Sequence, residues 1–198
     1  MDCCDPPTTL NLRTTDREQD LVVRGFVALW NAQLPRPADL DADPATIQSL
    51  QTRGLLVLSD DGHIIGIHGL SARPTAHQIT HPGGTIHTWC AFDAIGIPAA
   101  LGLDARTHTT CPTCGQPLEV NINAGQASAD PQLQLWLPTA KCEHVLDELC
   151  AHANLYCNQQ HLAASIPEQA IGSILTITNA AQLGQSTWNA AATALQSP

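Results

Sequence analysis

Charged side chains are scarce in this sequence: they make up 13% of its 198 residues, and only 8 are Lys or Arg against 18 Asp or Glu. The resulting net charge of −10 disfavours binding to a phosphate backbone, which argues against nucleic acid as a partner. Aromatic residues are also rare, and no run of about eighteen apolar residues is present, so we expect no membrane span and no membrane partner. The first residues lack a basic segment followed by an apolar stretch, so we expect no secretory signal and a cytoplasmic protein.

What the sequence does contain is cysteine, 8 residues in all, together with enough hydrophobic residues (43%) for a substantial core. Eight cysteines could form a disulfide framework, but such frameworks belong to short exported chains. In a reducing cytoplasm cysteines are more often metal ligands or nucleophiles, and we follow that interpretation.

The first half of the chain has the pattern of a small helical module that ends in a hairpin. Apolar residues from Asp16 to Trp30 follow a helical stripe, and Asp43-Pro44 is a typical start for a second helix that Gly54 ends. Two short apolar runs, 55–58 and 64–70, flank a turn and predict a β-hairpin. This order of elements predicts a winged-helix-like module.

Such a module could bind DNA or could serve only in packing. Its second helix would be the recognition helix, yet residues 45–53 carry a single basic side chain, Arg53. A DNA-reading helix normally presents a basic face, so we favour the packing role.

The second half mixes one apolar helix, short strands and a closing helix, which places the whole chain in the α+β class. The helix should begin near His87 or Thr88 and end at Pro98 to Gly102. The remaining elements are three strands and an alanine-rich helix, predicted over 117–122, 133–137, 174–177 and 188–195. The predicted organisation is a flexible arm (1–15), the winged-helix-like module (16–73), a linker (74–84) and a catalytic α+β domain with short sheets (85–198).

The chemistry is predicted to centre on Cys90, Asp93 and a distant Cys150. A thiol and a carboxyl three positions apart share one face of a helix, and the helix dipole would lower the pKa of a thiol in the first turn. A lone buried cysteine is most often only an apolar core residue. Asp93, however, lies in an otherwise apolar run. Burying a carboxyl there is unfavourable in free energy, which indicates a functional role, and it would raise the pKa of the carboxyl. Trp89 would wall the site against water.

The same segment resembles the signature of the organomercurial (alkylmercury) lyases. The matching residues run in the family's order through most of the second half: Trp89-Cys90-Ala91-Phe92-Asp93, Ile97 to Gly102, Cys111 with Gly115 and Pro117, Leu149-Cys150-Ala151-His152, and Leu183-Gly184-Gln185. The resemblance implies that Cys90 and Cys150 bind mercury and that Asp93 donates a proton.

The resemblance weakens after Cys150. The family often has His-x-x-Phe-Phe there, whereas this chain has His152 followed by Leu155, Tyr156 and an additional Cys157. Cys157 is therefore an alternative second ligand in place of Cys150. His152 is the one histidine expected near the site, supporting it rather than binding metal.

Cys111-Pro112-Thr113-Cys114-Gly115 forms a separate signal. A Cys-x-x-Cys turn ending in glycine is half of a zinc site, because two thiolates from one tight turn fit a tetrahedral ion. Cys142 with His144 could supply the other half at an unusually short spacing. Two free thiols in a β-turn is the alternative, and a redox role is least favoured because no βαβ pattern surrounds the motif.

Taken together, these residues predict an organomercurial lyase that cleaves the carbon–mercury bond by protonolysis. One thiolate, Cys90, would capture the substrate, Cys150 would add a second sulfur, and Asp93 would protonate the carbon. No organic cofactor is required, Hg(II) is the bound product with Cys90, Cys150 and an Asp93 oxygen as its ligands, and small thiols or a mercuric reductase would accept it. The alternatives are a metal-responsive winged-helix regulator, and a lyase scaffold that only sequesters mercury or another soft metal such as copper.

Overall fold

The computed structural model describes residues 14–139 and 144–196, so most of the expected arm (1–15) and Cys142 lie outside the described residues. The helices are α1 (Asp16–Trp30), α2 (Pro44–Thr52), α3 (Ala91–Ala100), α4 (Gln159–Ser165), α5 (Ile177–Thr187) and α6 (Asn189–Gln196), with a 3-10 turn η1 (Pro37–Leu40) and a π-helical turn η2 (Leu146–Cys150). The strands are β1 (Leu56–Leu58), β2 (Ile64–Ile67), β3 (Leu70–Ser71), β4 (His77–His81), β5 (Gly84–Thr88), β6 (Ala105–Thr110), β7 (Pro117–Asn123), β8 (Gln126–Ser128), β9 (Gln134–Pro138), β10 (Asn154–Tyr156) and β11 (Gly172–Leu175).

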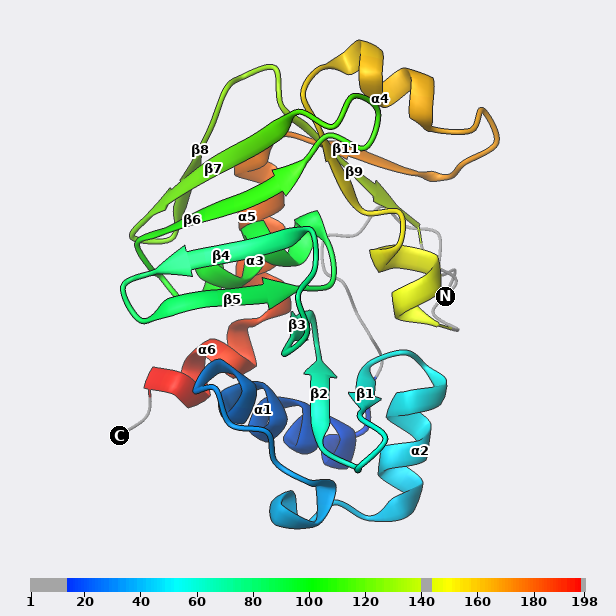
Figure 1. The fold of residues 1–198 in the computed structure, drawn as a ribbon, viewed down its shortest axis with the longest axis vertical. Helices are drawn as coiled ribbons and strands as arrows, with labels where there is room; N and C mark the ends of the chain where they lie inside the picture. The colour runs from blue at the N-terminus through cyan, green and yellow to red at the C-terminus, as the bar shows by residue number, and fades with distance from the viewer. Residues whose placement is uncertain (1–13, 140–143, 197–198) are drawn as a thin grey trace.

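Two antiparallel sheets organise these elements. Eight strands form one sheet in the order β1-β2-β3-β5-β4-β6-β7-β8, and β10-β9-β11 form a small second sheet. Helices α3 and α5 pack against each other and cover one face of the large sheet. Helices α1, α2 and α6 lie at the end of that sheet formed by β1, β2 and β3 (Figure 1). The α+β class predicted from the sequence is confirmed. Within the described residues, no helix has the length and apolarity needed to cross a membrane.

Helix α1 has the predicted bounds, because both its start and its buried face are encoded locally. Thr15 caps the helix by accepting from the Glu18 amide (3.3 Å), and the Glu18 carboxylate accepts from the Thr15 amide (2.7 Å). Most of the predicted apolar stripe is buried, Phe26 fully so, and α1 packs against β2 and β3.

The predicted linker over 74–84 contains strand β4. Ile79 at its centre is fully buried, while the flanking residues are polar, so only one side chain signals the strand in the sequence. β4 pairs with β5 across the turn at 82–83 and with β6 on its other side. The large sheet therefore runs without interruption from the helical module into the second half, and the division into separate domains stays a prediction.

Several element boundaries in the second half differ from those expected; β7 ends one residue later, β9 is shifted by one residue, and β11 begins two residues earlier. His87 and Thr88 belong to β5, so α3 begins at Ala91 rather than near His87. β11 ends at Leu175 because Thr176 caps α5 through the Asn179 amide (3.2 Å). The closing helix begins one residue later than predicted.

Candidate active site

Cys90 is the N-cap of α3, and Asp93 is the third residue of the helix. Cys90 has an extended backbone (φ −147°), and its amide donates to the Asp93 carboxylate at 3.0 Å. This is the geometry of a capping box with a thiol in the usual place of Ser or Thr. The carboxyl is thereby turned back toward the thiol that precedes the helix.

Cys150 reaches the same place from the end of the π-helical turn η2. Just beyond it, the Ala153 carbonyl accepts from the Ala91 amide at 3.1 Å, which ties this segment to the start of α3. The Cys150 sulfur lies 4.0 Å from the Asp93 carboxylate oxygen, and the ligand atoms of Cys90, Asp93 and Cys150 all lie within 4.8 Å of one another. The structure thus brings together the three residues that the sequence singled out.

All three side chains are buried, at most 5% exposed, and their ionisation reflects this. Burial raises the pKa of Asp93 to about 7, against the opposing effect of hydrogen bonds to its carboxylate. Burial, the contact with the Cys150 thiol and the nearby carboxylate raise the pKa of Cys90 far above its usual range. The pKa of Cys150 is lowered by its contact with the Cys90 thiol, but burial and the Asp93 charge outweigh this and leave it raised. The expected lowering of the Cys90 pKa by the helix dipole is therefore wrong, because desolvation is the larger effect.

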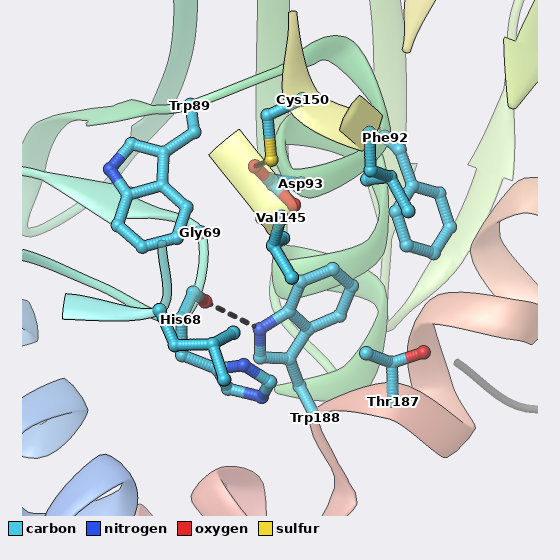
Figure 2. Close-up of a pocket in the computed structure, with 11 residues that line it drawn as sticks. His68, Gly69, Trp89, Phe92, Asp93, Val145, Cys150, Thr187 and Trp188 are labelled. Carbon is cyan, nitrogen blue, oxygen red and sulfur yellow. Dashed lines mark hydrogen bonds between the residues drawn. The ribbon is translucent and has the colours of Figure 1, made fainter. Parts of the chain in front are cut away.

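A mostly apolar cavity opens beside this group. Figure 2 shows the Cys150 sulfur next to the Asp93 carboxylate, with the Trp89 and Phe92 rings on opposite sides in this view. The lining residues come from both halves of the chain: Leu55, His68, Gly69, Trp89, Phe92, Asp93, Val145, Leu149, Cys150, Thr187 and Trp188. Cys150 and Asp93 line the cavity, whereas Cys90 is fully buried behind it.

His68 is the histidine at this cavity, not His152, which is exposed. Burial lowers the pKa of His68 to about 4, so its ring is neutral at pH 7. Its carbonyl accepts from the Trp188 indole nitrogen at 2.9 Å, as the dashed line in Figure 2 marks. No local sequence signal indicates this contact, because the two residues are 120 positions apart.

The remaining predicted ligands lie in a second group. Cys111 and Cys114 meet Cys157 and His161, with the four ligand atoms within 4.8 Å of one another. Cys157 is thus placed with the Cys-x-x-Cys turn rather than with Cys90. The spacing Cys157-x-x-x-His161 is the sequence signal for this second pair of ligands, but nothing local joins it to the Cys111 turn, which lies 43 or more positions away.

Comparison with known proteins points to a single family. Residues 70–189, more than half of the chain, match the family model described as alkylmercury lyase. The alkylmercury lyase of Bacillus cereus is 26% identical over 145 residues, which cover 69% of this chain and 63% of that protein. The alkylmercury lyase of Streptomyces lividans is 30% identical over 133 residues, covering 63% of this chain and 59% of that protein.

The fold is also that of a solved protein. The crystal structure of the mercury-bound form of MerB2 superposes with a TM-score of 0.78 at 22% identity, covering 92% of this chain and 95% of that one. The match to the curated relatives spans less than two thirds of their length.

Proposed function

The chain belongs to the alkylmercury lyase family, and from that premise we propose that it cleaves carbon–mercury bonds of organomercurials by protonolysis. One observation carries the proposal: two thiols and one carboxyl converge within 4.8 Å at the wall of an apolar cavity. Thiolate sulfur is the matching ligand for a soft metal, and a carboxyl with a pKa of about 7 can hold a proton at neutral pH.

We propose that Cys150 makes the first contact with R–Hg⁺, because it lines the cavity whereas Cys90 lies behind it. This reverses the order expected from the sequence. The Cys150 thiol loses its proton as the sulfur–mercury bond forms, and Asp93, 4.0 Å away, is the nearest carboxylate to receive it. Cys90 then adds its sulfur and releases a second proton to solvent.

Protonation of the carbon follows. The carbon–mercury bond breaks with its electron pair on carbon, Asp93 delivers a proton to that carbon, and the hydrocarbon R–H leaves. Hg(II) stays on the two sulfurs, so no atom changes its formal oxidation state and no organic cofactor is needed. The walls formed by Trp89, Phe92 and Trp188 would hold the organic group and exclude water.

The bound Hg(II) needs an incoming sulfur to leave, so small thiols or a mercuric reductase are the proposed acceptors. The five cysteines of the described residues are all free, which supports a cytoplasmic location. The structural zinc expected at Cys111 and Cys114 would lie in a separate group and take no part in the reaction.

We assign the helical module, winged-helix-like in its order of elements, a packing role. Arg53, which directly follows α2 as its C-cap, forms an ion pair (3.3 Å) with the buried Glu18. Leu55 at the start of the hairpin lines the cavity. The module therefore contributes a wall of the site, and a DNA-binding regulator is not favoured.

The test is to incubate the protein with a phenylmercury salt and excess small thiol and to measure benzene by gas chromatography. Wild type should release benzene, and Cys150→Ser should not. Asp93→Asn should bind Hg(II) as wild type does but release benzene roughly 10²- to 10⁴-fold more slowly. Asp61→Asn, at an exposed turn, is the matched control and should react at the wild-type rate.

Two other outcomes would contradict the proposal. Wild type that binds mercury without releasing benzene would be a sequestering protein, and the lyase proposal would fail. Benzene release by Asp93→Asn at the wild-type rate would place the acid elsewhere.

A further inference from the structure

A second group of metal-binding side chains lies apart from the Cys90 group, and the lyase reaction does not use it. It consists of Cys111, Cys114, Cys157 and His161, whose sulfur and Nδ1 atoms lie within 4.8 Å of one another. Three thiols and one imidazole are a common donor set of structural zinc sites. We propose that these four residues bind one Zn²⁺ as a closed structural site.

The spacing of the ligand atoms fits a tetrahedral ion. With zinc–sulfur bonds of about 2.3 Å and a zinc–nitrogen bond of about 2.0 Å, neighbouring sulfurs lie about 3.8 Å apart and sulfur and nitrogen about 3.5 Å apart. Here Cys114 and Cys157 sulfurs are 3.9 Å apart, and Cys111 sulfur lies 3.8 Å from His161 Nδ1. The Cys157 to His161 separation, 2.9 Å, would open by about half an ångström around the ion.

The first pair of ligands comes from a turn of the knuckle type. The Gly115 amide donates to the Cys111 carbonyl at 2.8 Å, and Gly115 has the left-handed φ (+73°) that favours glycine. Backbone amides of Thr113, Cys114 and Cys157 point at the Cys111 sulfur. Such N–H···S contacts stabilise a metal-bound thiolate.

The second pair comes from the start of α4. Asn158 caps this helix by accepting from the His161 amide at 2.8 Å, which fixes the residue one turn after Cys157. The side-chain nitrogen of Asn158, Nδ2, also donates to the Cys157 sulfur at 3.4 Å. Thr113 in the knuckle reaches the His161 carbonyl at 2.9 Å, so the two halves are joined independently of the thiols.

A disulfide is the competing use of these thiols. The 3.9 Å between the Cys114 and Cys157 sulfurs is well beyond the length of a sulfur–sulfur bond, about 2.05 Å. A disulfide would also leave Cys111 and His161 facing it without a role. Four protein ligands leave no open position, so the ion is structural rather than catalytic.

Zinc at this place would fasten the β6–β7 turn to β10 and α4. Strand β10 begins four residues after Cys150, so the ion would steady the segment that presents Cys150 to the cavity. The zinc site itself does not depend on the proposed lyase reaction.

The experiment measures metal content in protein purified under reducing conditions without chelator. We expect about one zinc per chain by mass spectrometry of the metal. Cys114→Ser, which changes the exposed ligand, and His161→Ala should each lower the zinc content at least tenfold. Gln160→Ala, the exposed neighbour on α4, and Cys150→Ser, in the other thiol group, are the matched controls and should keep it.

A second measurement does not depend on variants. Zinc is removed from the wild type and cobalt(II) is added; a tetrahedral site of three thiolates gives intense thiolate-to-cobalt and d–d absorption at one equivalent. Zinc addition should also raise Tm by about 5 °C or more.

Three results would overturn the proposal. One is wild-type protein without zinc that also gives no cobalt absorption. Another is loss of zinc from Cys150→Ser with retention in Cys114→Ser, which would place the ion at the other thiols. The third is a mass that shows a disulfide between Cys114 and Cys157 in the reduced preparation.

Discussion

Asp93 is a buried carboxyl whose pKa is raised by burial to about 7, and this makes a prediction about stability. The unfolded chain releases this proton near its usual pKa of 3.8, while the folded chain keeps it until about 7. Between these values the folded state binds more protons, so this group lowers stability as the pH rises and the loss is complete above about pH 7.

Asp93→Asn removes the titration but keeps an oxygen to accept from the Cys90 amide. The Tm of Asp93→Asn minus that of wild type should therefore be larger at about pH 8 than at about pH 5. Thermal unfolding followed by circular dichroism at both pH values measures the difference, and all other titrating groups are shared by the two proteins. An identical difference at both pH values would mean that the carboxyl titrates normally.

Gly69 is the backbone position that lets Asp93 fit. Its φ is +94°, and a Cβ there would lie 2.9 Å from the Asp93 carboxyl carbon. Gly62 has a similar φ of +86°, but a Cβ there would meet nothing within 4 Å. Alanine at Gly62 would therefore introduce backbone strain alone, whereas alanine at Gly69 would introduce the same strain and a clash with Asp93.

Gly62→Ala should cost only the strain of a left-handed alanine, about 1 to 2 kcal/mol. Gly69→Ala should cost that strain and also displace the carboxyl, with a larger fall in Tm and at least a tenfold loss of benzene release. Both quantities are measured on the two variants in parallel. Equal effects in Gly69→Ala and Gly62→Ala would show that the carboxyl does not depend on this close approach.

The sequence predicted the reactive residues better than their surroundings. Asp93 could be predicted because a carboxyl in an apolar run is unusual on its own, without knowledge of its neighbours. Cys150 lies 57 positions away, and the family resemblance is the specific support for pairing it with Asp93. The contacts of Trp188 with His68, and of Cys111 with His161, join residues far apart in the chain, and no periodic pattern encodes them.

At the scale of elements, local signals decided what could be predicted. Helix α1 has a Thr cap and a continuous apolar stripe, and its bounds were predicted correctly. Helix α3 has Cys90 as its cap, outside the usual set of Ser, Thr, Asp and Asn, so its start was placed too early. Strand β4 was missed because Ile79 is its single buried side chain.

The packing of α3 on α5 depends on two glycines that face each other. A Cβ at Gly184 would lie 2.2 Å from the Gly96 Cα, and one at Gly96 would lie 2.5 Å from the Trp188 ring. Because a Cβ at Gly184 would meet backbone atoms of Gly96, no side-chain rotation could relieve the clash. Trp188 follows α5 and lines the cavity, so this contact also sets a wall of the site.

Gly184→Ala should therefore destabilise the protein by about 1 to 3 kcal/mol or more, although alanine is by itself the better helix former by about 1 kcal/mol. Gln182→Ala, exposed on the same helix, is the control and should leave stability unchanged or slightly higher. Urea unfolding of the two variants measures both. A stabilised Gly184→Ala would contradict the close approach of the helices.

At the scale of the whole molecule, the two halves predicted from the sequence share one sheet and one core. β3 of the helical module pairs with β5, and the Trp89 amide donates to the Gly69 carbonyl at 2.9 Å beside the cavity. Helix α1 packs against α6 at the other end of the chain (Figure 1). The buried residues of both halves form one continuous cluster.

This continuity predicts one cooperative unfolding transition. A module that shared only a linker with its neighbour would unfold separately, whereas here loss of β3 would expose the edge of β5 and open the cavity wall that Leu55 and Gly69 form. Differential scanning calorimetry should show a single peak with a ratio of calorimetric to van't Hoff enthalpy near 1. Chain 74–198 expressed alone should lack a cooperative transition, because its β5 edge and the core residues that pack against the missing module would face water. Two resolved peaks, or cooperative unfolding of the shortened chain, would mean that the shared sheet does not couple the halves.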